Sequence, residues 1–110
     1  MNPPQDQPHE FYFIVVPGGP LTPRLAALEV GDPVWLAPRA NGFFSIGEVA
    51  SADVLWCLAT GTGIGPFLSM LRTDEAFAKF ERVVLVHAVR SVEELTYRTE
   101  IADIGHARAG

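Results

Sequence analysis

The sequence predicts a mixed β and α/β fold, because the residue pattern differs between the two halves of the chain. Before about residue 51, short apolar and aromatic runs alternate with Pro-Gly, Gly-Asp and Asn-Gly turns, a pattern typical of a β-barrel or sandwich. Beyond it, a strand, a glycine-rich loop, a helix, a second strand and a second helix follow one another, as in α/β domains. We therefore expect two domains, residues 1–51 and residues 52–110.

The first half contains two predicted strands with a short helix between them. Phe11–Val16 is an aromatic and β-branched run that ends at the turn Pro17–Pro20, and Val34–Ala37 is a similar run closed by a proline. Between the two strands, Thr22 can cap a short helix with a proline in its first turn. Leucines three or four residues apart give this helix, over about 21–28, one apolar face.

The second half reads as alternating strands and helices. Val54–Ala59 is apolar at every position, as expected of a parallel strand that is covered on both faces. The next elements that we expect are a helix over 66–71, a helical turn over 76–80 and a strand over 83–86. Ser91 and Glu94 have the spacing of a capping box, which predicts a last helix over 92–104.

Composition excludes several classes of protein. The formal net charge is −5 and lysine and arginine form no cluster, so we expect no nucleic-acid partner. No apolar run is long enough for a membrane helix, and the start of the sequence lacks the pattern of a signal peptide. The single cysteine, Cys57, excludes an internal disulfide and a cysteine-ligated metal site, and its apolar neighbours predict a buried thiol. We expect a cytoplasmic monomer without a metal, and Trp35 and Trp56 in its core.

The glycine-rich loop is the clearest candidate site. Residues 58–66 read LATGTGIGP, and a loop between a parallel strand and a helix presents backbone N–H groups and the positive end of the helix dipole to an anion. The loop has no lysine, which disfavours a Walker loop, and its glycines follow G-x-G-x-G rather than G-x-G-x-x-G. Arg90 stands at the end of the next strand, where NAD-binding domains have a carboxylate and where a 2′-phosphate is well matched by an arginine. The alternative is that the glycine loop only connects a strand to a helix and binds no ligand. For His87, the sequence favours a structural role over contact with a cofactor.

Several segments together resemble one family. LATGTGIGPFLSML, the preceding PGGPLTPRLAAL and GFF, and the following VLVHAVR resemble the bacterial ferredoxin/flavodoxin–NADP reductases, in order from about Phe11 to Ile104. The resemblance implies a Greek-key β-barrel that binds FAD, followed by a Rossmann-like α/β domain that binds NADP(H). It also implies hydride transfer between NADP(H) and FAD, with single electrons exchanged with ferredoxin or flavodoxin.

The resemblance also implies roles for individual residues. Thr60, which would face the flavin beside the nicotinamide, is the expected catalytic residue. The expected FAD-binding residues are Tyr12, Phe13, Ile14, Val15, Pro20, Leu21 and Thr22. The expected NADP-binding residues are Thr60, Gly61, Thr62 and Gly63, with Val89 and Arg90 at the adenosine end.

The sequence also departs from the family pattern. The family's Arg-x-Tyr-Ser motif, which belongs just before the first strand, is replaced by MNPPQDQP, and the chain stops at Ala109-Gly110 before the later NADP-binding strands. We therefore expect a fragment that lacks both ends of the family's fold. A non-catalytic truncated fragment and the reductase component of an oxygenase are the alternative interpretations.

Overall fold

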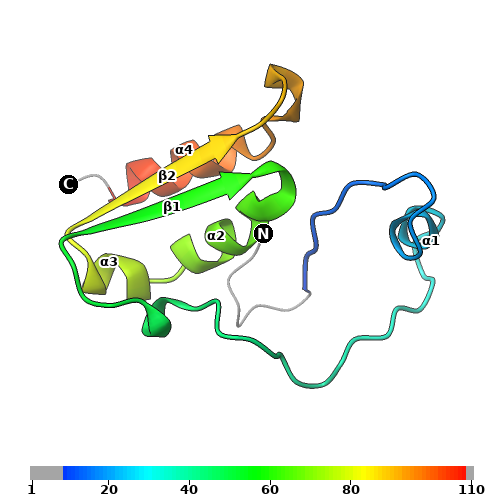
Figure 1. Cartoon of the computed structure of the whole chain (residues 1–110), viewed down its shortest axis with the longest axis horizontal. Helices are drawn as coiled ribbons and strands as arrows, with labels where there is room; N and C mark the ends of the chain where they lie inside the picture. The colour runs from blue at the N-terminus through cyan, green and yellow to red at the C-terminus, as the bar shows by residue number, and fades with distance from the viewer. Residues whose placement is uncertain (1–8, 109–110) are drawn as a thin grey trace. The chain divides into compact units, whose positions relative to one another are not determined.

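The chain divides into two compact units. The computed structural model describes residues 9–108 (Figure 1). One unit comprises residues 13–44, and the other comprises the chain up to Tyr12 together with everything from Ser45 onward. The domain boundary near residue 51, predicted from the change in residue pattern, stays a prediction.

The second unit is built on a two-stranded parallel sheet. Strand β1, Val54–Thr60, pairs with strand β2, Arg82–Ala88, in a register that runs from Val54 opposite Arg82 to Thr60 opposite Ala88. The connection between them contains a 3₁₀ turn and the helices α2, Ile64–Leu71, and α3, Glu75–Lys79. Both predicted strands and both predicted helices are confirmed, and α2 begins two residues earlier than expected.

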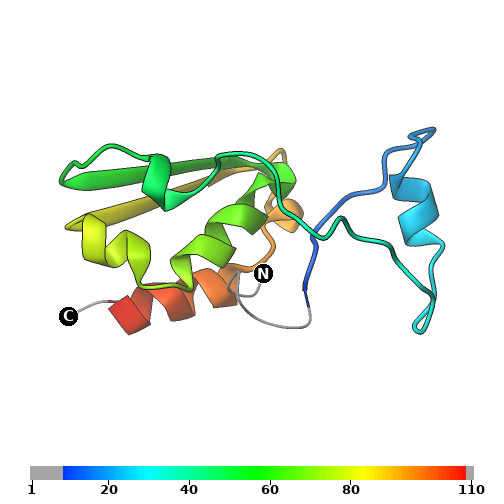
Figure 2. The same ribbon diagram turned by 90° about the horizontal axis from the view of Figure 1, so that it is seen from below.

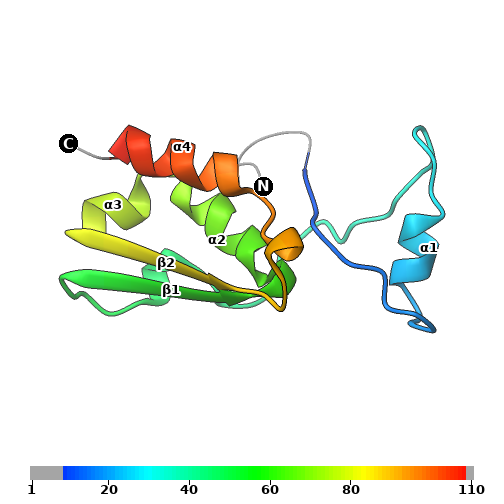
Figure 3. The same ribbon diagram turned by 90° about the horizontal axis from the view of Figure 1, so that it is seen from above.

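The helices all lie on one face of this sheet. Figure 3 shows α2, α3 and α4 on the same side of β1 and β2. Side chains alternate along β1, so Cys57 points into the core whereas Trp56 and Leu58 remain 62% and 68% exposed on the other face. The expectation of a strand covered on both faces, and of a buried Trp56, is therefore wrong for the part of the chain that the structure describes. Trp35 is also exposed rather than in the core.

The core of this unit lies between the sheet and α2. Ile64 and Leu68, four residues apart on α2, are fully buried against the inward-facing residues of β1. Ile46, in a 3₁₀ turn that precedes β1, packs with Phe80 in a second buried cluster. The Lys79 ammonium group stabilises this segment by donating hydrogen bonds to the backbone carbonyls of Ile46 and Val49. These two bonds tie the segment before β1 to α3.

The predicted last helix is interrupted. A single 3₁₀ turn covers Val92–Glu94, and the helix α4 runs over Arg98–Arg108. The Glu94 carboxylate accepts a hydrogen bond from the backbone N–H of Arg90 at 3.0 Å, rather than closing a capping box with Ser91. Tyr97, with φ of +61°, then turns the chain into the left-handed region and separates the two helical pieces. No helix that the structure describes is long and apolar enough to cross a membrane.

The unit of residues 13–44 is largely irregular chain around one short helix (Figures 1 and 2). Helix α1, Thr22–Ala26, is confirmed, but its N-cap is Leu21, and the Thr22 hydroxyl accepts the backbone N–H of Val16 at 2.7 Å instead. The predicted strands Phe11–Val16 and Val34–Ala37 are not formed. A strand requires a hydrogen-bonded neighbour, and these segments have no ladder partner among residues 9–108, so no Greek-key barrel is present there.

Candidate functional site

Parallel pairing brings the two predicted NADP-binding segments to one edge of the sheet. Thr60, the last residue of β1, pairs with Ala88, the last residue of β2. The loop that follows β1 and the segment Val89–Arg90 that follows β2 therefore both begin at this edge. In α/β sheets, ligands bind outside the carboxyl ends of the strands, and this edge is where that rule places a ligand.

The loop begins with a 3₁₀ turn, Gly61–Gly63, that passes directly into α2. Thr60 is exposed and extended at its start, and no side chain caps either the turn or α2. The N–H groups at the start of a helix have no partner within that helix. No capping side chain competes there with an anionic or polar ligand, and the exposed Thr60 carries a hydroxyl at the same point.

The glycines of the loop serve different purposes. Gly61 has φ of +52°, a conformation that favours glycine, and Gly65 is buried within α2. Gly63 has φ of −62° and ψ of −9°, which any residue adopts, and a Cβ added there would have no neighbour within 4 Å. Neither the backbone nor internal packing requires a glycine at position 63. A glycine at this position leaves the space beside the loop backbone open, and Thr62 before it is half-buried.

Arg90 supplies the positive charge of this edge. Its side chain is exposed, and its backbone N–H is fixed by the Glu94 carboxylate at 3.0 Å. Val89 before it is half-buried. An arginine at this point presents a planar fork of donors that matches a phosphate group.

His87 links the two strand ends, which sequence reasoning did not anticipate. It lies opposite Ala59 in the sheet, and its Nε2 is 2.8 Å from the carbonyl oxygen of Gly61. The sequence favoured a structural histidine, and the structure gives it a contact with the loop itself. The available signal was its position at the end of a parallel strand, next to the strand that carries the glycines.

The residues predicted on the flavin side fall into both units. Tyr12 belongs to the unit of the sheet, where its ring packs edge-on against Tyr97 with centroids 5.3 Å apart. Burial, and then the carboxylate of Glu10, raise the pKa of Tyr97. The others belong to the unit of residues 13–44, in extended chain, the turn and α1: Phe13, Ile14, Val15, Pro20, Leu21 and Thr22. Their role toward FAD stays a prediction.

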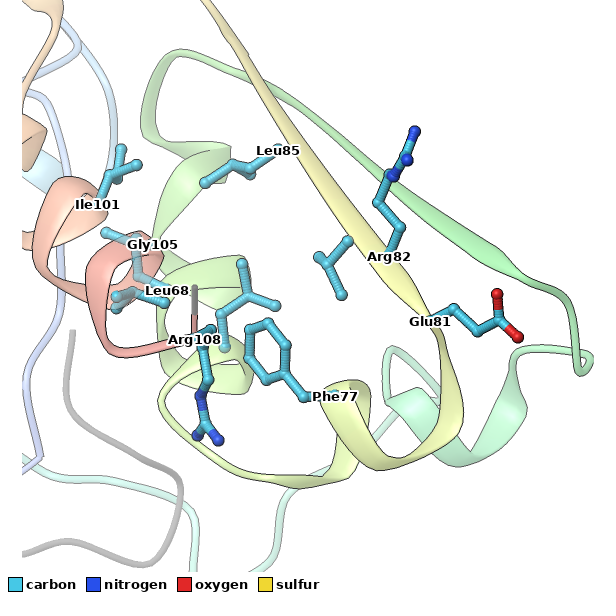
Figure 4. A pocket seen from close by; sticks show the side chains of 11 residues that line it. Leu68, Phe77, Glu81, Arg82, Leu85, Ile101, Gly105 and Arg108 are labelled. Carbon is cyan, nitrogen blue, oxygen red and sulfur yellow. The ribbon is translucent and has the colours of Figure 1, made fainter. Parts of the chain in front are cut away.

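An apolar cavity of about 430 Å³ lies away from this edge, between α4 and the rest of the core (Figure 4). Its lining includes Leu68, Phe77 and Ile101, and its charged residues include Arg82, at the amino end of β2. The glycine loop lies at the opposite end of the strands. This cavity is a gap in the packing of α4 and is distinct from the candidate site.

Cys57 takes no part in the site. Its side chain is 2% exposed within the core, and burial raises the pKa of the thiol. A thiol held in its protonated form is a poor nucleophile. The prediction of a buried structural cysteine is confirmed.

The described fold is a small mixed α/β fragment with a two-stranded parallel sheet, and comparison with known proteins identifies its family. Residues 57–110 match the family model of the oxidoreductase NAD-binding domain. The chain is 47% identical over 97 residues to the flavodoxin/ferredoxin–NADP reductase of Escherichia coli, an alignment that covers 88% of this chain and 39% of that protein. It is 44% identical over 102 residues to the enzyme of the same name from Rhodobacter capsulatus, with 93% and 38% covered. A ferredoxin–NADP reductase of Azotobacter vinelandii is 37% identical over 102 residues, with 93% and 40% covered.

The chain therefore belongs to the flavodoxin/ferredoxin–NADP reductase family. It spans about two fifths of the length of these curated relatives.

Proposed function

We propose that this chain supplies the dinucleotide-binding edge of an FAD-dependent ferredoxin (or flavodoxin)–NADP(+) reductase. The observation that carries the proposal is the placement of a glycine loop with open space at Gly63 beside an exposed Arg90, at the carboxyl edge of a parallel sheet. The names of the relatives favour this function over a non-catalytic remnant or the reductase component of an oxygenase.

The residues at this edge fit NADP(H). Arg90 would pair with the 2′-phosphate, beside Val89 at the adenosine end, which selects NADP(H) over NAD(H). Gly61, Thr62 and Gly63 would let the dinucleotide lie against backbone N–H groups at the start of α2. Thr60, whose hydroxyl caps neither helical piece, would orient the nicotinamide ring at the end of β1.

The predicted flavin side consists of Tyr12–Val15 and Pro20–Thr22. When bound, NADP(H) and FAD supply hydride transfer between nicotinamide and flavin and single-electron exchange with ferredoxin or flavodoxin. The exposed apolar side chains of Phe13 and Ile14 suit the edge of a flavin ring, and the protein's contribution is position and electrostatics rather than acid–base chemistry. A cytoplasmic location and a monomeric state remain part of the proposal.

A chimaeric reductase tests the assignment of Arg90. In the full-length Escherichia coli relative, the 97 matching residues would be replaced by those of this chain, and FAD content would be checked by absorbance. We expect the chimaera to oxidise NADPH in preference to NADH, with ferricyanide as the electron acceptor. Arg90→Ala removes a charge-assisted contact of about 1.5–3 kcal/mol, so kcat/KM for NADPH should fall about 10- to 150-fold while that for NADH changes little.

Arg82→Ala is the matched control, because Arg82 is also exposed but lies at the opposite end of β2. We expect the control to keep the full preference for NADPH. An FAD-loaded chimaera that oxidises neither nucleotide would refute the proposed function. An unchanged preference for NADPH in Arg90→Ala would refute only the role assigned to Arg90, and not the proposed function.

A further inference from the structure

The hydrogen bond between His87 and Gly61 fixes one peptide group of the dinucleotide loop. The carbonyl oxygen of Gly61 can only accept, so the Nε2 atom of His87, 2.8 Å away, must carry the proton. The other ring nitrogen, Nδ1, is buried without a hydrogen-bond partner. A hydrogen on Nδ1 would be a buried donor without an acceptor, which is costly, so the geometry assigns the Nε2–H tautomer.

The orientation of this peptide decides where the next N–H group points. A peptide group is planar and trans, so the Gly61 carbonyl and the Thr62 N–H point in opposite directions. His87 draws the carbonyl toward the end of β2 and thereby directs the Thr62 N–H away from it. Thr62 lies in the first turn of the helical segment, where N–H groups have no partner within the helix.

The His87 contact is a restraint on this peptide from outside the loop's own 3₁₀ turn. Gly61 adopts φ of +52°, and glycine populates positive and negative φ with similar ease, so the peptide between Gly61 and Thr62 can rotate. No side chain caps the 3₁₀ turn, and a Cβ at Gly61 would meet nothing within 4 Å. The restraint therefore comes from the neighbouring strand, at the register position opposite Ala59.

We propose that His87 is a positioning residue that presents the Thr62 N–H to the nicotinamide half of NADP(H). The inference rests on the proposed function, because it needs a dinucleotide at this edge. It assigns His87 to the nicotinamide half of the site and leaves the 2′-phosphate to Arg90.

The tautomer is tested directly on this chain. Two-bond ¹H–¹⁵N correlation spectra of the labelled protein distinguish a protonated from an unprotonated ring nitrogen, and Arg90→Ala serves as a variant with an unaltered ring. We expect a protonated Nε2 and a bare Nδ1 for His87. A spectrum that shows the Nδ1–H tautomer would overturn the inference whatever the chimaera does.

The positioning role is tested in the FAD-loaded chimaera with His87→Leu and His87→Gln. Leucine removes the donor, whereas the glutamine amide places an N–H near the original Nε2. We expect flavin reduction at saturating NADPH, followed by stopped-flow absorbance, to slow about 2- to 12-fold in His87→Leu and to recover in His87→Gln. The dissociation constant of 2′,5′-ADP, which has the adenosine half but no nicotinamide, should stay the same in both variants.

Two outcomes would count against His87 without touching the proposed function. One is an unchanged rate of flavin reduction in His87→Leu, while Arg90→Ala still loses its preference for NADPH. The other is an equal loss of 2′,5′-ADP affinity in both histidine variants, which indicates a general structural role. A parent chimaera that carries FAD but does not bind 2′,5′-ADP would instead refute the proposed NADP(H) site itself.

Discussion

Gly63→Ala should stabilise the fold while it weakens binding of the dinucleotide. Gly63 has helical dihedral angles, φ of −62° and ψ of −9°, and its added methyl group would have no neighbour within 4 Å. A glycine-to-alanine change at such a position restricts the unfolded chain and gains about 0.4–1 kcal/mol in the free energy of unfolding. The same methyl group would project into the space proposed for NADP(H), where forcing an extra carbon between packed groups costs about 1–3 kcal/mol.

The two effects are measured separately. Urea unfolding of this chain, followed by tryptophan fluorescence, gives the change in the free energy of unfolding. Titration of the chimaera with NADP⁺ gives the change in the dissociation constant, which we expect to rise about 5- to 150-fold. Gly61→Ala is the matched control, because Gly61 also faces open space but has φ of +52°, so alanine there should destabilise the fold by about 1–2 kcal/mol.

A Gly63→Ala chimaera that binds NADP⁺ as tightly as its parent would refute the reasoning, since the glycine would then have no ligand to accommodate. A loss of stability in Gly63→Ala would show that the methyl group meets protein rather than ligand.

Further predictions concern the core. Leu68→Ala should lower the free energy of unfolding by about 2–5 kcal/mol, because Leu68 is fully buried, whereas Leu58→Ala, at a residue 68% exposed, should change it by less than about 0.5 kcal/mol in urea titrations. The Cys57 thiol should react with Ellman's reagent only after unfolding, and rapid reaction of the native chain would contradict its burial. Because burial raises the pKa of Cys57 above its ordinary value of 9.0, the folded state holds this proton more tightly than the unfolded state. The contribution of Cys57 to the free energy of unfolding should therefore be fully present below pH 9.0 and decrease above it. Cys57→Ala, compared at the same pH values, should lack this part of the decrease.

The second half of the chain was predictable because its signals are local. The apolar run Val54–Ala59 and the glycine loop define a strand and a loop whatever surrounds them, and the structure forms both. The first half was not, because Phe11–Val16 and Val34–Ala37 have the composition of strands but no neighbour to pair with among residues 9–108. Strand propensity measures how well a residue fits a sheet and does not supply the sheet.

The capping residues show the same limit. Ser91 and Glu94 have the correct spacing for a helix start, yet the chain makes one 3₁₀ turn and reverses at Tyr97 before α4. The Tyr97 ring packs against Tyr12, which is distant in the sequence. A contact between residues so far apart in the sequence cannot be predicted from the local spacing of residues.

Local patterns were enough to predict the two core strands, the glycine loop between β1 and α2, and the arginine that follows β2, because spacing and residue type carry these features. Three findings required the packed structure: which face of the sheet is covered, that Gly63 has no internal reason to be glycine, and that His87 contacts the Gly61 carbonyl. The last of these depends on the register that sets His87 opposite Ala59, one residue from the end of each strand. Register is a property of two paired segments, and neither segment contains it alone.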